Sequence, residues 1–385
     1  MSFGNIDPPS IRVTPPNSDD DIADRLHHRW TVMLLALLSL LVIYQGYVGD
    51  PIHCWCPAQF SDSHCNYTEA LCWIQETYFV PTDESLPTED GNKNAKIKYY
   101  PWVPVILLFL ALSYKAPNII WKMLKTASGV NLYKMISHCN DCQIGKEREC
   151  AIEDVGDFLD RWLTNSKRAT YGTVHAVIVK TSACFCFCLG KRTGTYLAGL
   201  YLGVKICYLA VSISMILLLN KFLAIKYTFY GYEVLENIVA NRELPESPRF
   251  PTVILCEFDI RQMQNLQRYT VQCVLSVNLY NEKIFAFLWF WFVLMMMLGL
   301  YSYIMWLKKI IIPSMRRDFV NKYLGYIDKD LLKEENSKVV EKFTRDYLST
   351  DGVFALRMIE YNTSVVVVMD LMKCLWNKSK RSIEA

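Results

Sequence analysis

Residues 256–291 read CEFDIRQMQNLQRYTVQCVLSVNLYNEKIFAFLWFW, a segment with two cysteines that passes without interruption into a long apolar stretch. Every odd position from Tyr269 to Leu279 is apolar or aromatic, and this alternation predicts a strand with one covered face. No charged residue occurs over the 24 positions from Ile284 to Leu307. At about 1.5 Å per residue, a helix of that length exceeds the roughly 30 Å hydrocarbon core of a bilayer. A membrane boundary is therefore predicted near Lys283.

Three further apolar stretches have nearly the length that a membrane span needs. Hydrophobic residues make up 52% of the chain and charged residues 21%, and the two kinds are segregated along it. We therefore predict an all-α membrane protein with a bundle of four transmembrane helices, at 30–49, 102–121, 197–220 and 284–307. The net charge of +3 and the lack of a basic stripe interleaved with aromatics argue against a nucleic-acid partner.

The distribution of Lys and Arg predicts the orientation, because cytosolic flanks of membrane spans are enriched in both. Within twenty residues of the span ends, the terminal segments and the middle loop hold 14 of them, and the other two loops hold 7. We predict that the tail 1–29, the loop 122–196 and the segment 308–385 are cytosolic. The loops 50–101 and 221–283 are predicted to be extracellular and to contain short strands.

Six cysteines fall in the two predicted extracellular loops, where disulfides persist. Their spacing does not determine the pairing, because six cysteines allow 15 connectivities. Cys54 and Cys273 both lie near a membrane entry, which favours a bond between them. The full set of expected pairs is Cys54–Cys273, Cys72–Cys256 and an extra pair Cys56–Cys65.

A glycosylation sequon also lies in the first of these loops. It consists of Asn66, Tyr67 and Thr68, so an N-linked glycan is predicted at Asn66.

Polar residues near the first and third predicted spans are candidates for lining an aqueous path. The acidic cluster Asp19, Asp20, Asp21 and Asp24 is typical of a helix start. It forms either a solvated cap or a short helix in the funnel at the cytosolic mouth of a pore. Ser39, inside the first span, suits a water-lined face or ordinary helix packing. Lys205 lies roughly 12 Å into the third span and faces either the bundle or an aqueous path.

The sequence contains no motif that points to catalysis. A glycine-rich phosphate loop, a His-Glu-x-x-His and a nucleophile elbow are all missing, so we predict that the protein is not an enzyme and needs no cofactor. No metal is predicted either, because His138 and its neighbouring cysteines lack a second close ligand pair. The stretches 152–163 and 332–348 alternate charged and apolar residues at helical spacing, which predicts helices in the cytosolic segments.

Several short segments resemble the motifs of one channel family. They are Asp24-Arg25-Leu26, Gly49-Asp50-Pro51-Ile52-His53-Cys54-Trp55, Tyr99-Tyr100-Pro101-Trp102-Val103, Gln272-Cys273-Val274-Leu275, Asn281-Glu282-Lys283-Ile284-Phe285 and Asp351-Gly352-Val353-Phe354. From about Asp20 to about Met358 the chain resembles the innexins, the channel proteins of invertebrate gap junctions, and in particular those of the nematode type.

The resemblance implies a homo- or hetero-oligomer with other innexins, as an octameric ring around one wide aqueous pore. Such rings lie in the plasma membrane among its lipids and dock onto the ring of an adjacent cell to form a gap junction, with both termini cytosolic. The four aspartates and Ser39 are then expected to line the narrow entrance of the pore. Ions and small metabolites pass passively through a pore of this kind.

The chain departs from the family pattern at three points in its first outer loop. Pro101 replaces a glutamine, Cys56 and Cys65 exceed the usual two cysteines per loop, and a glycan at Asn66 adds bulk. In the related pannexins, glycans oppose the docking of two hemichannels. Two alternatives therefore stay open, which are an undocked hemichannel that releases small molecules from one cell, and a non-conducting structural or adhesion protein.

Overall fold

The computed structural model describes the chain in eight stretches, which are 19–80, 96–97, 99–141, 146–168, 194–222, 229–240, 250–328 and 337–384. They divide into two compact units. The first, called the sheet unit here, contains the described residues of Leu26–Asn118 and Ile206–Tyr301. The second, called the helical unit, contains those of Met1–Arg25, Ile119–Lys205 and Ser302–Ala385.

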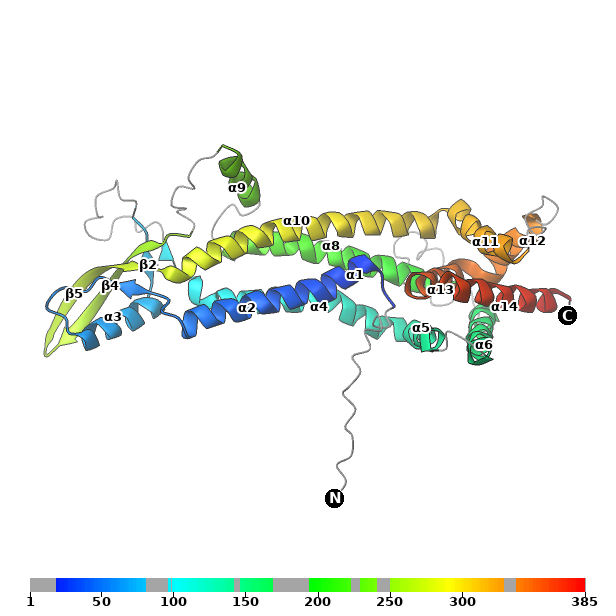
Figure 1. Ribbon diagram of the computed structural model, residues 1–385, viewed down its shortest axis with the longest axis horizontal. Coiled ribbons are helices and arrows are strands. Elements are labelled where there is room, and N and C mark those ends of the chain that lie inside the picture. The colour runs from blue at the N-terminus through cyan, green and yellow to red at the C-terminus, as the bar shows by residue number, and fades with distance from the viewer. Residues whose placement is uncertain are drawn as a thin grey trace, which may run out of the picture. The chain divides into compact units, whose positions relative to one another are not determined.

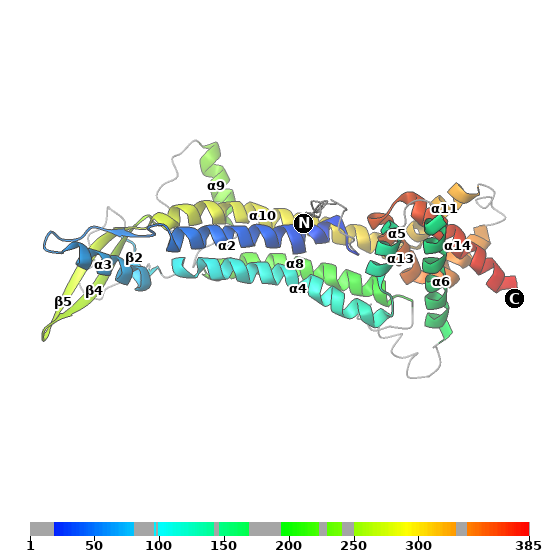
Figure 2. The same cartoon turned by 60° about the horizontal axis from the view of Figure 1, so that its bottom comes forward.

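Four helices are long and apolar enough to cross a membrane, and the predicted four-helix membrane architecture is thereby confirmed. They include α2 (Val32–Tyr47), α4 (Val103–Lys125), α8 (Tyr196–Phe222) and α10 (Ser276–Ile311). A helical stretch through α1 (Ile22–Arg25) and η1 (Leu26–Thr31) precedes α2, and the short η2 (Tyr100–Trp102) precedes α4. Within the sheet unit, the segments of these helices run alongside one another (Figure 1, Figure 2).

The core of this bundle is formed by apolar side chains with no exposed surface, among them Leu35, Leu107, Phe285 and Phe292. The opposite face of α2 is also apolar but exposed, with Leu37 and Leu40 more than half accessible. Because a helix that is apolar on every side requires an apolar environment, these exposed faces suit lipid or neighbouring subunits.

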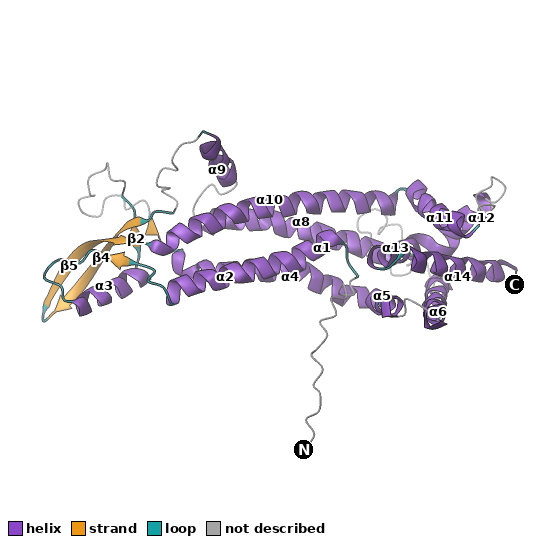
Figure 3. Ribbon diagram, viewed as in Figure 1, coloured by secondary structure: helices purple, strands orange, loops and turns teal. Residues whose placement is uncertain are grey.

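A five-stranded antiparallel sheet completes the sheet unit, with the strand order β1-β5-β4-β2-β3 (Figure 3). Its strands are β1 (His53–Cys54), β2 (Thr77–Tyr78), β3 (Lys96–Ile97), β4 (Val253–Gln262) and β5 (Asn265–Val274). The hairpin β4–β5 pairs over its full length, from Val253 opposite Val274 to Gln262 opposite Asn265. Ile254, Cys256 and Phe258 are buried, as the two-residue period of a strand with one covered face requires.

The predicted strand over 269–279 is wrong at its C-terminal end, because β5 ends at Val274 and α10 begins at Ser276. The apolar residue Leu279 is more than half exposed. Buried side chains instead recur at helical spacing from the start of α10, at Val277, Asn281 and Phe285. Leu275 and Val277 therefore fit the alternation only by coincidence, and the helical period prevails over it.

The sheet unit contains two further helices, α3 (Asp62–Ile74), which follows β1 and precedes β2 in the sequence, and α9 (Tyr230–Val239), which follows α8 and precedes β4. The sequence analysis did not anticipate α3. Ser61 and His64 form a reciprocal capping box at its start, but His64 stands where the usual sequence pattern has Glu or Gln, so the helix start is not evident from the sequence.

The helical unit is built around α13 (Ser349–Asn362), whose residues from Asp351 to Ile359 are all buried. Its other elements are η3 (Thr126–Ser128), α5 (Leu132–Asp141), α6 (Lys146–Arg168), α11 (Pro313–Ile327), α12 (Ser337–Lys342), η7 (Phe343–Leu348) and α14 (Val365–Glu384). The predicted helix over 152–163 lies within α6. Of the stretch 332–348, residues 337–348 are helical and 332–336 lie outside the described residues.

Candidate functional site

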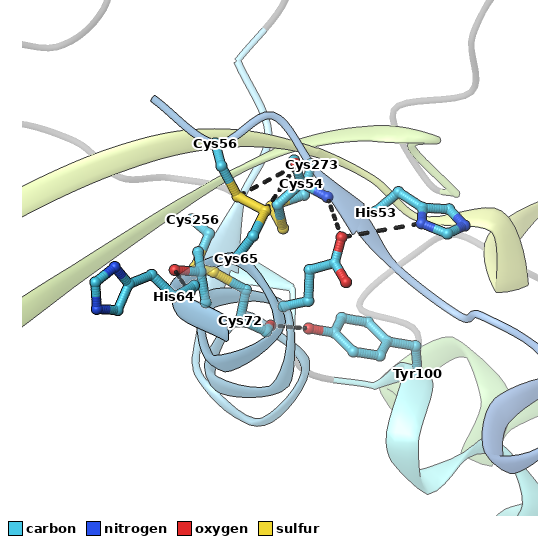
Figure 4. Close-up of a disulfide and its surroundings, with 11 residues drawn as sticks. His53, Cys54, Cys56, His64, Cys65, Cys72, Tyr100, Cys256 and Cys273 are labelled. Atoms are coloured by element: carbon cyan, nitrogen blue, oxygen red, sulfur yellow. Dashed lines mark hydrogen bonds and ion pairs between the residues drawn. A yellow bond between two sulfur atoms is a disulfide. The ribbon is translucent and has the colours of Figure 1, made fainter. Parts of the chain in front are cut away.

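Three disulfides fasten the sheet of the sheet unit. They join Cys54 to Cys273, Cys72 to Cys256 and Cys56 to Cys65, with Cα–Cα distances of 4.0, 5.8 and 5.9 Å (Figure 4). These are the pairs that the sequence analysis expected. The sulfurs of Cys54, Cys72 and Cys273 lie near one another, but each belongs to a disulfide and offers no thiolate to a metal.

The backbone explains how each pair is brought together. Cys54 on β1 lies directly opposite Cys273 on β5 in the antiparallel register. Cys65 and Cys72 both belong to α3, so this helix is bonded at one point to the β1 segment and at another to Cys256 on β4. The two long-range bonds therefore connect the first loop with the second.

Polar contacts support the same arrangement. The backbone N–H of Cys54 donates to Oε1 of Glu69 on α3 at 3.1 Å, and Nδ1 of His53 lies 3.9 Å from the same oxygen. The hydroxyl of Tyr100 donates to the carbonyl of Cys72 at 3.1 Å (Figure 4). Because Tyr100 directly precedes α4, this bond links α3 to the start of a membrane-spanning helix. We refer to β1, α3, β2, β4, β5 and their three disulfides as the disulfide-linked region.

The hairpin tip of this region projects without cover. Met263 is 99% exposed and Leu266 is 60% exposed. Met263 also has a φ of +54°, a left-handed conformation that residues other than glycine rarely adopt. Arg268 forms ion pairs with Glu257 and Asp259 on the facing strand, at 3.5 and 3.2 Å. The disulfide-linked region thus offers a preorganised surface of apolar and charged groups.

Asn66 is exposed on α3, and Cys65 beside it is held in a disulfide. Thr68 of the sequon is buried, and its hydroxyl donates to the carbonyl of His64 at 2.9 Å. The amide of Asn66 is therefore available to solvent in the folded chain, and a glycan there would lie on the surface of the disulfide-linked region.

A second candidate site lies in the helical unit, around the four N-terminal aspartates. Lys205 on α8 is 2% exposed, and its ammonium donates to Asp21 at 2.6 Å and contacts Asp24 at 2.8 Å. Asp21 also accepts from Ser302 at 2.7 Å and from the indole of Trp306 at 2.8 Å. We refer to Asp21, Asp24 and Lys205 as the aspartate–lysine cluster.

The neighbouring aspartates are held in the same way. Asp19 accepts from the indole of Trp121 at 3.1 Å and forms an ion pair with Lys125. Asp20 forms an ion pair with Arg25 at 3.4 Å, and the guanidinium of Arg25 also donates to Asn362 at the end of α13, at 3.0 Å. The N-terminal segment is thereby attached to α4, α8, α10 and α13.

The predicted pore-lining residues Asp19, Asp20, Asp21, Asp24 and Ser39 are all buried within the single subunit. The four aspartates are between 3% and 7% exposed, and three cations of the same chain, Arg25, Lys125 and Lys205, contact them. Ser39 has no exposed surface, and its hydroxyl donates to the carbonyl of Pro104 at 3.0 Å. Buried charges require such ionic and hydrogen-bonding partners. That these residues line the entrance of a pore stays a prediction.

One further residue was missed by sequence reasoning. Asp351 is 4% exposed, and its two carboxylate oxygens accept from the backbone N–H groups of Leu197 and Ala198 at 3.2 and 3.0 Å. It therefore caps the start of α8 from a position 154 residues away. Burial raises the pKa of Asp351 to about 6, although the bonds from these N–H groups act in the opposite direction.

Comparison with known proteins shows one family throughout. The family model described as Innexin matches residues 20–379. The chain is 35% identical to Innexin unc-9 of Caenorhabditis elegans, with 93% of this chain and 92% of that protein covered. It is 33% identical to Innexin-19 of the same organism, with 96% and 85% covered. For Innexin-11 the identity is 32%, with 94% and 79% covered.

Proposed function

Because this chain belongs to the innexin family of gap junction channel proteins, we propose that its disulfide-linked region docks onto an opposing ring in the adjacent cell. It is a multi-pass protein of the plasma membrane. We further propose that the subunits form an octameric ring, homomeric or with other innexins, with both termini cytosolic. Ions and small metabolites then pass through its pore along their gradients, with no covalent chemistry.

The observation that carries the docking proposal is the exposed tip of the β4–β5 hairpin on a covalently fastened base. Met263 and Leu266 present apolar surface, while Cys54–Cys273 and Cys72–Cys256 hold the strands behind them. A surface that is already ordered loses little conformational entropy when it meets a partner. This small entropy loss favours docking by direct contact between two rigid hairpin tips.

The orientation is supported by the cysteines. Within the described residues, the six disulfide-bonded cysteines all lie in the two loops proposed to be extracellular. The described cysteines outside these loops, Cys139, Cys150, Cys207 and Cys374, are not disulfide-bonded. Disulfides persist outside the cell and thiols stay reduced in the cytosol, so this division agrees with the excess of Lys and Arg on the proposed cytosolic side.

Recordings from paired cells test the proposal. Both cells express only this protein, and the current across their junction is measured. We expect a junctional current, which disappears when one cell of the pair lacks the protein. A current across the membrane of single cells without any junctional current would contradict docking.

The exposed Asn66 favours a second candidate, an undocked hemichannel. If a glycan there prevents docking, Asn66→Gln will increase the junctional current while dye uptake by single cells stays unchanged. Equal junctional currents for the two proteins would exclude this role for the glycan. A third candidate, the non-conducting adhesion protein, is excluded by any current that the purified protein produces in liposomes.

A further inference from the structure

A cavity of about 580 Å³ opens in the helical unit where α11, η7 and α13 meet. Pro313 starts α11 at its edge, Arg345 comes from η7, and Ser349 with Thr350 starts α13. Its volume lies within the range of roughly 300–1,000 Å³ that is typical of small-ligand sites. Nothing in the channel function described above uses this cavity.

The lining carries a clear excess of positive charge. Three guanidinium groups, those of Arg316, Arg317 and Arg345, face one carboxylate, that of Glu341. Arg316 donates to the hydroxyl of Thr350 at 2.5 Å. Across the part of the chain that the structure describes, the guanidinium groups of Arg317 and Arg345 have neither an ion pair nor a hydrogen bond. Their donors remain available to a ligand.

One helix N-terminus reinforces this charge. α11 begins at the cavity, and the exposed N–H groups of a helix start favour an anion. The first turn of α11 contains no acidic residue that would balance this start. α13 adds no comparable start, because it follows η7 directly and the N–H of Asp351 donates to the carbonyl of Gly194 at 2.8 Å.

We propose that this cavity binds a phosphate monoester, with Arg317 and Arg345 contacting the phosphate oxygens. The planar guanidinium fork matches phosphate with two parallel hydrogen bonds. The hydroxyls of Ser349 and Thr350 supply further donors at the same wall. A dianion with three terminal oxygens satisfies more of these donors than a carboxylate does, which is why phosphate is the preferred chemistry.

Two sources offer this chemistry, the inositol phosphate headgroup of a membrane lipid and a soluble inositol phosphate. Pro313 follows closely after Ile311, the last residue of the membrane-spanning α10. Lys308 and Lys309 lie in the last turn of that helix. A basic cavity directly beside the cytosolic end of a span is within reach of anionic headgroups. The lipid source rests on the proposed cytosolic orientation, whereas the soluble source does not.

The test uses the full-length protein in phosphatidylcholine nanodiscs. Soluble inositol 1,4,5-trisphosphate is titrated by calorimetry, and binding to vesicles that contain phosphatidylinositol 4,5-bisphosphate is measured in parallel. Vesicles with phosphatidylserine at the same surface charge serve as the comparison for unspecific attraction. We expect saturable binding that the double variant Arg317→Gln/Arg345→Gln weakens by about tenfold or more, because two charge-assisted hydrogen-bonding groups are lost.

The matched control is Lys373→Gln/Arg381→Gln, which removes the same charge from exposed positions of α14 and should leave the affinity within about twofold of wild type. Arg345→Lys keeps the charge but loses the planar fork, and we expect an intermediate affinity. Binding of both probes supports the shared phosphate chemistry, and binding of the vesicles alone assigns the lipid source. Binding of neither probe, equal binding of phosphatidylserine, or unchanged affinity in the double variant would overturn the proposal.

Discussion

The disulfide-linked region and the aspartate–lysine cluster solve the same problem with different chemistry. Each holds together segments that are far apart in sequence, 219 residues apart for Cys54 and Cys273 and 184 residues apart for Asp21 and Lys205. In the first case a covalent bond limits the freedom of the unfolded chain. In the second, buried opposite charges must compensate the loss of their hydration.

Disulfides and buried ion pairs are therefore lost under different conditions. A disulfide is indifferent to pH and salt but depends on an oxidising compartment. A buried ion pair survives in a reducing compartment, yet removal of one partner leaves an uncompensated charge in the interior. The distribution of the two chemistries along this chain follows the proposed sides of the membrane, and single substitutions can break either one.

The largest effect is expected from Cys273→Ser, which removes the longest-range disulfide. In the chain-entropy description a loop of this length contributes about 5 kcal/mol, so we expect loss of surface assembly and of junctional current. Surface biotinylation and recordings from paired cells measure the two. The double variant Cys56→Ser/Cys65→Ser opens a bond between residues only 9 apart, worth about 3 kcal/mol, and should retain more assembly. Normal coupling in Cys273→Ser would refute the role of this bond.

A similar but smaller loss is expected from Lys205→Met in the aspartate–lysine cluster. The substitution leaves Asp21 and Asp24 buried beside each other without their cation, which costs about 3–5 kcal/mol. Thermal unfolding of the purified protein measures the change. Lys221→Met, on an exposed position of the same helix, is the control and should change stability by less than about 0.5 kcal/mol.

The same variant permits a rescue experiment. Adding Asp21→Asn and Asp24→Asn to Lys205→Met removes the unpaired charges, so part of the lost stability should return. If Lys205→Met unfolds at the same temperature as Lys221→Met, the ionic fastening contributes nothing. If the triple variant is less stable than Lys205→Met, the cost is not electrostatic.

The pH dependence of stability separates Asp351 from the disulfides. Its pKa rises from the ordinary 3.8 to about 6 in the folded chain, so the folded state holds its proton more tightly than the unfolded state. Its contribution is therefore complete below about pH 4 and is lost as the pH rises through about 6, a change of about 3 kcal/mol. We therefore expect the difference in unfolding temperature, wild type minus Asp351→Asn, to decrease as the pH is raised from about 4 to about 6.

The control for that experiment is Asp346→Asn, which makes the same charge change on an exposed side chain. A constant difference between wild type and Asp351→Asn across this pH interval would contradict the raised pKa. The three disulfides should give no such pH dependence, because disulfide-bonded cysteines do not titrate.

The smallest effect concerns the hairpin tip. Met263→Gly relieves a left-handed backbone conformation and removes no packing, because the side chain is 99% exposed. We expect a gain of about 1 kcal/mol in stability. Gln264→Gly changes the adjacent residue, whose φ is not positive, and should not stabilise. A lower unfolding temperature for Met263→Gly would show that the side chain packs against something that stabilises the tip.

The sequence predicted those features that depend on local composition. Spans follow from the length and hydropathy of uninterrupted stretches. Which six cysteines form disulfides follows from the loops that are predicted to face an oxidising compartment, whereas their pairing does not, because six cysteines allow 15 connectivities. The alternation at Leu275 and Val277 misled because two apolar residues satisfy both periods over so short a stretch. The alternation is too short in this segment to distinguish a strand from a helix.

The acidic cluster could not be interpreted from the sequence for a different reason. The partners of Asp21 are Lys205, Ser302 and Trp306, which lie between 184 and 285 residues away. A run of aspartates before a span is compatible with exposure or burial, and only the tertiary structure brings the compensating donors to it. The same holds for Asp351, whose role depends on the start of α8.

The two disulfides that join the loops can form only late in biosynthesis, because the second cysteine of each pair is synthesised long after the first. Cys54 leaves the ribosome 219 residues before Cys273, and Cys72 leaves it 184 residues before Cys256. At roughly 5–20 residues per second, Cys54 waits about 11–44 s as a thiol before its partner exists. Cys56 and Cys65 can react almost at once, and each early bond between them removes two competitors for the waiting thiol. The short disulfide therefore protects the long one from mispairing while the second and third spans, α4 and α8, are being made.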